Sequence, residues 1–414
     1  MKAKHILLTS IVFIFLISSL VSGSTIITDN YIKVFGVSIW KPYDAIVARY
    51  PDMAGDYVCQ DSDCSDEIQS AIDYVESNGG GTVFIKSGVY PINNTIYIGN
   101  NTMLKGNSRQ SAIVNQGNSK MIVNKPSSSN IVITDLYFDG GGKNYAIIDF
   151  STADNVRITM NTFTNVGSTA SVAVNDGTNF IISNNIFAPP FGGDAIYSNN
   201  AERLVVYGNE IDSPGDTGVA IDGSVEAKSI VVSNNIIKNN GQQGIALGGN
   251  ANKVTISSNI IYGGARGIRL DPFGYPTEPN QVNIINNILT DLSTVGIELY
   301  ENYSVLVAFN RFVSVPTKVI EHSSTTRNVV YFKNIGYATE NYGTNTFSGD
   351  DVTQEFYINH GLVSQPTTVV VTPVSLNATG DFYVSFNDTT ITIHYVNPPP
   401  SGTDNIILSW YATI

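Results

Sequence analysis

Residues 182–187 read ISNNIF, residues 232–237 read VSNNII and residues 256–261 read ISSNII. Each phrase places an aliphatic residue three positions before an asparagine and a large apolar residue two positions after it. Nine such copies, counting one with leucine as its anchor, lie between Ile133 and Gly336. Their anchors are Leu136, Asn161, Asn185, Asn209, Asn235, Asn259, Asn287, Asn310 and Asn334. Successive anchors are 23 to 28 residues apart, and a period of this size predicts stacked coils.

A second short strand follows each asparagine by eight to ten residues, as in AIYS from Ala195, GIAL from Gly244 and GIRL from Gly267. Strand alternation sends the second and fourth residues of these segments inward and the third outward. With two or three strands per turn, the coils stack at about 4.8 Å. We therefore expect the asparagines to form an internal ladder whose amides bond the turns of neighbouring coils.

Composition narrows the class of partner. Only 14% of the 414 residues are charged, against about 25% in typical domains. The net charge of −13 argues against nucleic acid, because phosphate binding needs clustered lysine and arginine. An acidic polysaccharide is also repelled on average and needs a local basic site.

The N-terminus, residues 1–23, predicts export. Lys2 and Lys4 precede an apolar run from Ile6 to about Val21, which is typical of a secretory signal cut near Gly23. A retained membrane anchor is the alternative, although the run falls short of the ~20 apolar residues that span a bilayer. The signal reading predicts a secreted, extracellular or cell-surface protein, and only the anchor reading implies a membrane partner.

Cys59 and Cys64 lie five positions apart, which in an exported chain predicts a local disulfide. The segment that follows, residues 65–78, predicts an amphipathic helix. Ser65 is expected to cap it, and the glycines at 79–81 end it. A helix directly before the first coil is suited to covering the open end of a solenoid.

Residues 56–108, DYVCQDSDCSDEIQSAIDYVESNGGGTVFIKSGVYPINNTIYIGNNTMLKGNS, resemble the start of the pectate-lyase superfamily, in its rhamnogalacturonase- and epimerase-like branch. EIQSAID, GGGTVFIKSGVY and the strand ending in LKG carry the resemblance, which extends with the repeats over residues 45–340. It implies a right-handed parallel β-helix. It leaves the reaction open, because the superfamily contains hydrolases, lyases, epimerases and phage or viral tail proteins.

The pattern breaks after Tyr337. Residues 338–351, ATENYGTNTFSGDD, predict a polar linker, and TTVVVTPVS, DFYVSFNDTTITIHYV and NIILSWYATI predict strands. We expect an all-β chain: a solenoid over residues 24–340 and a small sandwich-like module over 341–414. The module is expected to cap the solenoid, bind a glycan or surface, or promote oligomerisation. Its aromatic residues, interpreted mainly as core and alternatively as a sugar-stacking platform, are Phe382, Tyr383, Phe386, Tyr395, Trp410 and Tyr411.

Aligning the coils gathers polar residues on one outward face. The longest coil, from Asn259 to Asn287, contains the loop sequence DPFGYPTEPNQ directly after this face, and such loops commonly wall binding sites. We assign catalysis to Asp194, Asp216 and Arg269. The residues expected to bind substrate are Asp222, Arg266, Asp271, Tyr275, Glu298 and Tyr300.

Two reactions fit these residues. An inverting hydrolase needs an acid and a base about 6.5–9.5 Å apart, which Asp194 and Asp216 on neighbouring coils can provide. A lyase needs a base, with arginine or Ca²⁺ to neutralise a uronate, and Asp222 with Asp271 is the candidate Ca²⁺ site. A plainer interpretation is that Arg269 and Glu298 form only a surface ion pair.

The resemblance implies further catalytic elements that this chain departs from. The pectin hydrolases of the superfamily use a single aspartate, an adjacent aspartate pair, Gly-His-Gly and Arg-Ile-Lys. Here the aspartate pair is missing, Gln243 stands in place of the histidine, and Asp271 follows Arg269 where lysine belongs. The leading hypothesis is a hydrolase or lyase acting on an extracellular polysaccharide. The alternative is a non-catalytic glycan-binding surface protein, adhesin or viral tail-like protein.

Overall fold

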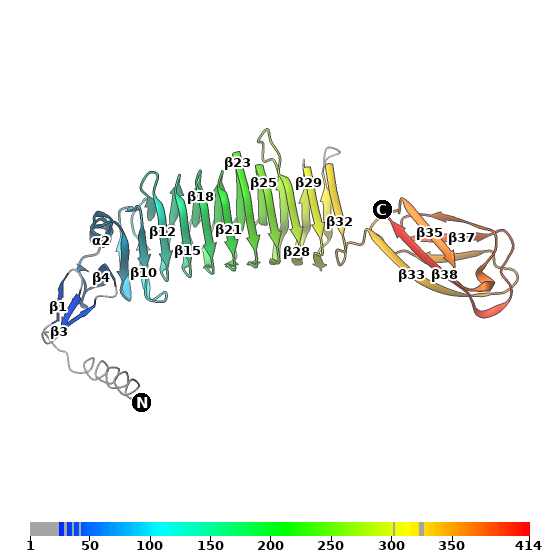
Figure 1. The fold of residues 1–414 in the computed structure, drawn as a ribbon, viewed down its shortest axis with the longest axis horizontal. Coiled ribbons are helices and arrows are strands. Elements are labelled where there is room, and N and C mark those ends of the chain that lie inside the picture. The colour runs from blue at the N-terminus through cyan, green and yellow to red at the C-terminus, as the bar shows by residue number, and fades with distance from the viewer. Residues whose placement is uncertain (1–24, 29–30, 35–36, 41–42, 301–302, 323–326) are drawn as a thin grey trace, which may run out of the picture.

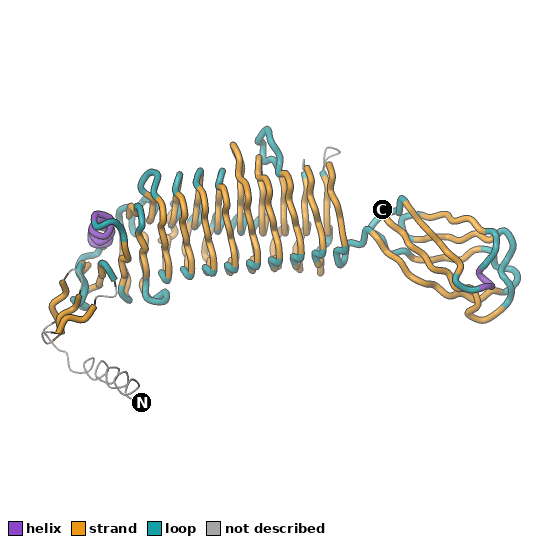
Figure 2. Tube along the Cα trace, in the orientation of Figure 1, coloured by secondary structure: helices purple, strands orange, loops and turns teal. Residues whose placement is uncertain are grey.

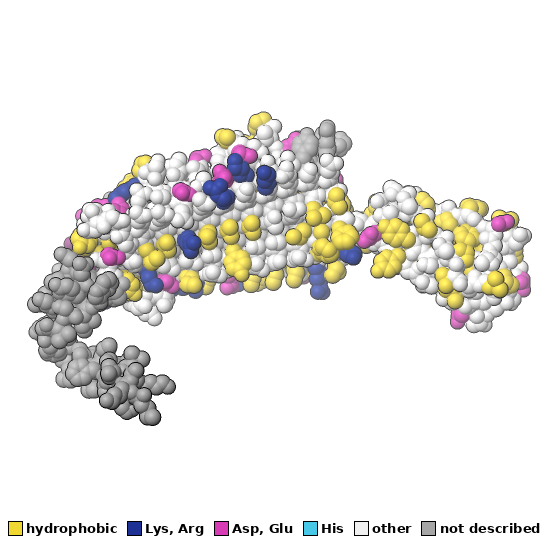
Figure 3. Space-filling view, in the orientation of Figure 1, with side chains coloured by type: hydrophobic (Ala, Val, Ile, Leu, Met, Phe, Trp, Pro, Cys, Tyr) yellow, Lys and Arg dark blue, Asp and Glu magenta, His cyan; other side chains and the backbone are white. Residues whose placement is uncertain are grey.

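The computed structural model describes residues 25–28, 31–34, 37–40, 43–300, 303–322 and 327–414. The predicted signal or anchor at 1–23 lies outside these residues. Within the described ranges, no helix is both long enough and apolar enough to cross a membrane. Figures 1 and 2 show a long row of stacked coils followed by a separate β module. The space-filling view in Figure 3 shows few charged side chains on the viewed face.

The coils form a parallel solenoid with three faces, because strands pair with their counterparts in the next coil. The first face carries β4 (Ala45–Arg49), β6 (Gly81–Ile85), β9 (Thr102–Lys105), β12 (Ser129–Thr134), β15 (Asp154–Thr159), β18 (Thr178–Ser183), β21 (Glu202–Tyr207), β27 (Asn280–Ile285), β29 (Tyr303–Ala308) and β32 (Arg327–Phe332). The second carries β7 (Gly88–Ile92), β10 (Ser111–Asn115), β13 (Tyr137–Lys143), β16 (Thr162–Val166), β19 (Ile186–Phe191), β22 (Glu210–Asp212), β24 (Ile236–Lys238) and β30 (Arg311–Val313).

The third face carries the second strand of each coil, whose outward columns were aligned from the sequence. Its strands are β8 (Ile96–Ile98), β11 (Ile122–Asn124), β14 (Ile148–Ser151), β17 (Val172–Asn175), β20 (Ile196–Asn199) and β31 (Thr317–Glu321). Four long strands bend from one face to the next: β23 (Val219–Ser233), β25 (Gln243–Ser257), β26 (Ile260–Asp271) and β28 (Ile288–Leu299). The predicted inward positions of this face, such as Ile196, Ile245 and Ile268, are fully buried.

The asparagine ladder is confirmed. Asn235 is buried, and its Nδ2 donates both to the Val206 carbonyl, at 3.0 Å, and to Asn259 Oδ1, at 3.0 Å. Its own Oδ1 accepts from the backbone N–H of Asn209 at 3.0 Å. The same contacts recur from coil to coil between Asn161 and Asn334. Each amide thus satisfies a buried turn of its neighbours, which an apolar side chain leaves unpaired.

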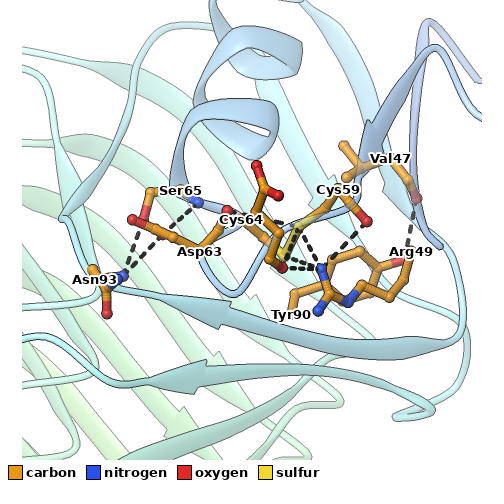
Figure 4. The surroundings of a disulfide bond; sticks show 9 residues. Val47, Arg49, Cys59, Asp63, Cys64, Ser65, Tyr90 and Asn93 are labelled. Atoms are coloured by element: carbon orange, nitrogen blue, oxygen red, sulfur yellow. Dashed lines mark hydrogen bonds between the residues drawn. A yellow bond between two sulfur atoms is a disulfide. The ribbon is translucent and has the colours of Figure 1, made fainter.

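The N-terminal end is closed by α2 (Ser65–Ser77), whose residues Ile68, Ile72 and Val75 are fully buried. The prediction that Ser65 caps this helix is wrong, because Cys64 occupies the N-cap position without a side-chain capping bond. The Ser65 hydroxyl instead accepts the N–H of Asn93 at 3.1 Å (Figure 4). The Ser65 side chain therefore binds the backbone directly after β7, at Asn93.

Cys59 and Cys64 form a disulfide with their Cα atoms 5.4 Å apart (Figure 4). Cys59 ends β5 (Tyr57–Cys59), which pairs with β4, and Arg49 Nη1 donates to the Cys59 carbonyl at 3.3 Å. The bond therefore ties the first coil to the start of the capping helix. Before it, β1 (Thr25–Thr28), β2 (Tyr31–Val34) and β3 (Val37–Trp40) form a small antiparallel sheet.

The C-terminal module contains two antiparallel sheets. One has the order β33 (Glu340–Gly349), β38 (Gly402–Thr413) and β35 (Thr368–Pro373), and the other β34 (Glu355–Asn359), β37 (Thr390–Tyr395) and β36 (Phe382–Phe386). A 3-10 turn, η1 (Leu376–Ala378), lies between β35 and β36. The predicted linker over 338–351 is wrong, because most of it forms β33. Phe347 is the one large apolar residue among its inward positions, so the usual apolar alternation is missing. Asn345, which also points inward, accepts Trp410 Nε1–H through its Oδ1 at 2.8 Å.

The aromatic residues of the module divide between core and surface. Phe382, Phe386, Tyr395 and Trp410 pack in the module core, which confirms the core interpretation for these four. Tyr383 is 63% exposed and stacks on His394 with ring centroids 4.5 Å apart. The core interpretation is wrong for Tyr383, and sugar stacking stays a prediction there.

Candidate active-site groove

A groove of about 520 Å³ opens on the third face of the solenoid, across the coils of β20, β23, β25 and β26. The strand register aligns Tyr197 with Ala220, Ala220 with Ala246, and Ala246 with Arg269. Two alanines therefore separate a tyrosine from an arginine along one outward column, and their small side chains leave the hollow. The groove is lined by Asp194, Tyr197, Asp216, Thr217, Ala220, Asp222, Gln242, Gln243, Ala246, Arg269, Phe273 and Tyr275.

The loop after Asp271 forms one wall, as predicted for Tyr275. It is the tall excursion above the middle of the solenoid in Figure 2. A Cβ on Gly248 would lie 2.6 Å from Phe273 Cδ2, and one on Gly249 would lie 2.8 Å from Tyr275 Cδ2. The two glycines thus admit the aromatic rings of the loop, which fold back over the preceding coil.

Among the carboxyl groups of the groove, Asp194 has the pKa that is shifted furthest from its ordinary value. Burial raises its pKa to about 6, and the nearby carboxylates Asp216 and Asp222 add to the rise. The Thr217 N–H donates to Asp194 Oδ1 at 3.0 Å and opposes the rise only in part. At mildly acidic pH this group is a protonated acid in a solvent-accessible groove, which is the state that a general acid needs.

Asp216 and Asp222 occupy different positions around Asp194. The register places Thr217 in the column of Asp194, so Asp216 lies one residue earlier. Asp222 Oδ2 accepts the Tyr197 hydroxyl at 3.2 Å, and burial raises the pKa of Asp222. The groove therefore holds one predicted acid with two further carboxylates.

The predicted ion pair between Arg269 and Glu298 exists, and its carboxylate is buried while Arg269 reaches the groove. The Glu298 side chain is 5% exposed and lies 3.7 Å from Arg269 Nε and 3.1 Å from Arg266 Nε. Its other oxygen contacts His322 Nε2 at 2.8 Å, and His322 stacks on Tyr300. The pair is thus part of an internal network, and the surface-pair interpretation is wrong.

Four residues expected to bind substrate belong to this network and do not line the groove: Arg266, Asp271, Glu298 and Tyr300. Asp271 and Glu298 pair with Arg269, whose guanidinium lies over the Tyr300 ring at 4.8 Å, and Arg266 pairs with Glu298. Their direct role toward substrate stays a prediction. Their contacts fit the positioning of Arg269 instead.

The contacts of Asp271 do not favour the proposed Ca²⁺ site with Asp222. Asp271 Oδ1 accepts the Phe273 N–H at 2.8 Å, and Oδ2 accepts Arg269 Nε at 3.0 Å. Among the residues that the structure describes, no group of three or more histidine, cysteine, aspartate or glutamate side chains is arranged to hold a metal ion. A calcium requirement stays a prediction.

Sequence reasoning missed Tyr197, Gln242 and Phe273 as groove residues. Tyr197 stood in the correct outward column, and the alanines beside it were the available sign of a hollow. Gln243 is buried, and its Oε1 accepts the Thr217 hydroxyl at 2.8 Å. The residue in the histidine's place is therefore a neutral support for the groove floor.

Comparison with known proteins places the fold. A family model described as right handed beta helix region matches residues 122–271 and 191–353, which together cover more than half of the chain. The chain belongs to the right-handed β-helix family. No curated protein matches its sequence.

Several solved structures resemble this β-helix protein. The family 28 exopolygalacturonase of Yersinia enterocolitica matches with a TM-score of 0.58 and 12% identity, over 72% of this chain and 71% of that chain. The tailspike of E. coli bacteriophage HK620, solved with a pentasaccharide, matches with 0.53 and 13%, over 88% and 92%. ORF18 of Geobacillus virus E2 matches with 0.54 and 13%, over 83% and 75%. At such identities the likeness shows the fold alone.

Filling the hollow of this β-helix protein is expected to remove ligand binding. Ala220→Leu adds a branched side chain between Tyr197 and Ala246, and we expect the affinity for a ligand of the groove to fall at least about tenfold because the added carbons occupy the ligand's place. Affinity electrophoresis against a panel of candidate polymers measures it. Ala173→Leu, in the same column beyond Tyr197, is the matched control. Equal losses in both variants would refute the assignment of the hollow.

Proposed function

We propose that this β-helix protein is a glycoside hydrolase that acts on an extracellular polysaccharide. The observation that carries the proposal is Asp194, a carboxyl group with a pKa of about 6 in a groove that also holds Asp216 and Asp222. Glycosidases of both stereochemical types use one carboxyl with a raised pKa as proton donor and a second carboxylate as base or nucleophile.

In this mechanism the protonated Asp194 donates to the glycosidic oxygen as the bond to the anomeric carbon breaks. Asp216, which is half-buried and lines the same groove, is the general base. It takes a proton from the water molecule that forms the new bond to the anomeric carbon. The Asp222 carboxylate accepts a hydrogen bond from a sugar hydroxyl, in addition to the one that it accepts from the Tyr197 hydroxyl. The rings of Phe273 and Tyr275 stack on the faces of the pyranose rings. The groove thus supplies the acid from the coil of β20, the base from the coil of β23 and the stacking rings from the loop after β26.

A lyase is less well supported by the same residues. Its chemistry needs a free cation to neutralise a uronate carboxylate next to the base. Arg269 is the arginine of the groove, and it already pairs with Asp271 and Glu298. The hydrolase is therefore the better fit.

Glycan as the ligand is supported by two similar folds: an exopolygalacturonase and a tailspike solved with a pentasaccharide. The aromatic wall and the tailspike likeness also support the second candidate, a non-catalytic glycan-binding protein. We propose secretion on the N-terminal segment 1–23, which reads as a signal peptide.

A panel assay tests the hydrolase. Purified protein is incubated with neutral and acidic polysaccharides, with and without chelator, while reducing ends and the absorbance of unsaturated products are followed. The proposal expects new reducing ends without unsaturated products, and their loss in Asp194→Ala/Asp216→Ala. Turnover of no polysaccharide, with glycan binding kept by the double variant, would establish the non-catalytic alternative.

The pH dependence of turnover follows from the raised pKa of Asp194. The acid must be protonated, so Asp194 is fully in its proton-donating form well below pH 6 and loses this form as pH rises through about 6. Above that value we expect kcat to fall about tenfold per pH unit. Initial rates at saturating substrate between pH 4 and pH 8 measure it. A profile that stays flat to pH 8 contradicts Asp194 as the acid.

A further inference from the structure

We propose that the groove accepts an uncharged polysaccharide and rejects polyuronates and other acidic chains. This inference rests on the proposed function, because it assigns a substrate class to the same groove. Two features of the groove support it: the charges that line it, and the ion pairs that already engage Arg269.

The lining carries three carboxylates against one guanidinium. Asp194, Asp216 and Asp222 face the hollow from neighbouring coils, and Arg269 is the one lysine or arginine among the described lining residues. Burial raises the pKa of Asp222 as well as that of Asp194, which reflects the cost of holding negative charge here. A further anion from the ligand meets the same cost.

The positive charge of Arg269 is already balanced by two carboxylates of the protein. Its Nε lies 3.0 Å from Asp271 Oδ2 and 3.7 Å from Glu298 Oε2, and the side chains of both carboxylates are 12% or less exposed. Arg266 offsets the second carboxylate at 3.1 Å. The two arginines and the two carboxylates therefore compensate one another, and the acidic side chains of the groove have no cationic partner among the described lining residues.

The faces of the Arg269 guanidinium are also covered. The Arg269 Cζ atom lies 5.2 Å from the ring centroid of Phe273 and 4.8 Å from that of Tyr300. Both rings therefore make cation–π contacts with the guanidinium. A bidentate grip on a uronate carboxylate uses one of the two donor edges of a guanidinium. The edge formed by Nε and Nη2 is already directed at Asp271 Oδ2, to which both nitrogens donate, and the nearby carboxylates of Asp271 and Glu298 repel an anion that approaches the rest of the group.

The remaining lining suits hydroxyl groups. Carboxylates accept hydrogen bonds from sugar hydroxyls without a charged partner, and the amides of Gln242 and Gln243 and the hydroxyls of Thr217, Tyr197 and Tyr275 add neutral donors and acceptors. Like charges placed opposite one another across an interface suppress the wrong ligand. The groove thus selects for neutral sugars by what it repels as much as by what it binds.

The test compares polymers that differ only in charge. Acidic polysaccharides are used before and after reduction of their carboxyl groups to primary alcohols with carbodiimide and borohydride, and binding to the full protein is measured by affinity electrophoresis. At low ionic strength, for the backbone that binds, we expect the reduced polymer to bind at least about tenfold more tightly than its acidic parent, with the gap narrowing as salt is added. Equal or tighter binding of the acidic parent overturns the inference, as does a failure to bind any neutral polymer.

Charge-removal variants link the preference to the groove. Asp216→Asn/Asp222→Asn is expected to reduce the discrimination to about threefold or less by removing two negative charges. Asp291→Asn, an exposed carboxylate in the coil of β28, is the matched control and keeps the full preference. Thermal unfolding verifies that each variant is folded. If the double variant keeps the full preference, the groove charges do not cause it and the inference fails.

The binding measurement separates this inference from the proposed function. Binding of neutral polymers without cleavage defeats the hydrolase and leaves the substrate class standing. Cleavage of an acidic polymer keeps the hydrolase and overturns the substrate class.

Discussion

Replacing Asp194 by asparagine is expected to lower kcat about 10³-fold, which is within the usual contribution of a general acid. The amide cannot donate a proton to a leaving oxygen, yet it keeps Oδ1 as the acceptor of the Thr217 N–H. The geometry of the groove therefore stays, and we expect KM to change less than about threefold, since ground-state binding is not removed. Steady-state kinetics at pH 5 on the polysaccharide that the wild type cleaves measure both constants.

Asp291→Asn controls for the loss of one carboxylate. This exposed side chain contacts Thr290 Oγ1 at 2.9 Å, and its positive φ of 54° suits asparagine. We expect wild-type kinetics in the control. Wild-type kcat in Asp194→Asn would show that another group supplies the proton.

Asp194→Asn also gives a test that needs no substrate. Burial raises the pKa of Asp194 from 3.8 to about 6. The protonated Asp194 side chain therefore makes its full contribution to the free energy of unfolding below pH 3.8, and this contribution is lost as pH rises through about 6. At pH 8 the asparagine variant is therefore expected to be more stable by about 2 kcal/mol, a gain that disappears near pH 4. Urea unfolding at both values of pH measures it, and equal stability at pH 8 contradicts the raised pKa.

Replacing Asn287 by alanine is expected to lower the free energy of unfolding by about 4 kcal/mol, because the buried groups that it served lose their partners. Its Oδ1 accepts the Asn259 N–H at 3.0 Å, and its Nδ2 donates to the Ile256 carbonyl at 3.0 Å. Since coils stabilise mainly their neighbours, unfolding is expected to begin around this coil. Urea unfolding followed by circular dichroism, with limited proteolysis to locate the first cuts, measures the effect.

Asn283→Ala is the matched control from the same coil. Asn283 is an exposed residue of β27, four positions before the ladder residue, and we expect its loss to change the free energy of unfolding by less than about 0.5 kcal/mol. Similar losses in both variants would mean that the ladder contributes nothing beyond an ordinary surface asparagine.

The solenoid itself could be predicted from particular residues. The spacing of the asparagines from Asn161 to Asn334 fixed the coil length, and the alternation in segments such as GIAL gave the inward and outward columns that the register confirms. These features follow from local rules. The two-residue alternation of a strand, and the pairing of each coil with the similar coil next to it, depend on residues close in the sequence pattern and not on distant ones. The polar strand β33 escaped the same reading, since its inward asparagines are satisfied by partners far along the chain, such as Trp410.

Aligning the coils also brought Asp194, Asp216, Asp222, Arg269 and Tyr275 to one face by sequence alone, and the groove contains all five. What the sequence determined, then, is the coil stack, its asparagine ladder and the residues that share an outward column. Only the tertiary structure decided that the loop after Asp271 folds back over Gly248 and Gly249. It also decided that Arg269 pairs with Asp271 and Glu298, while Asp194 is partly buried beside two other carboxyl groups. The reason is that columns follow from backbone periodicity, whereas charge pairing and burial depend on the volumes and conformations of side chains that meet only after the coils have stacked.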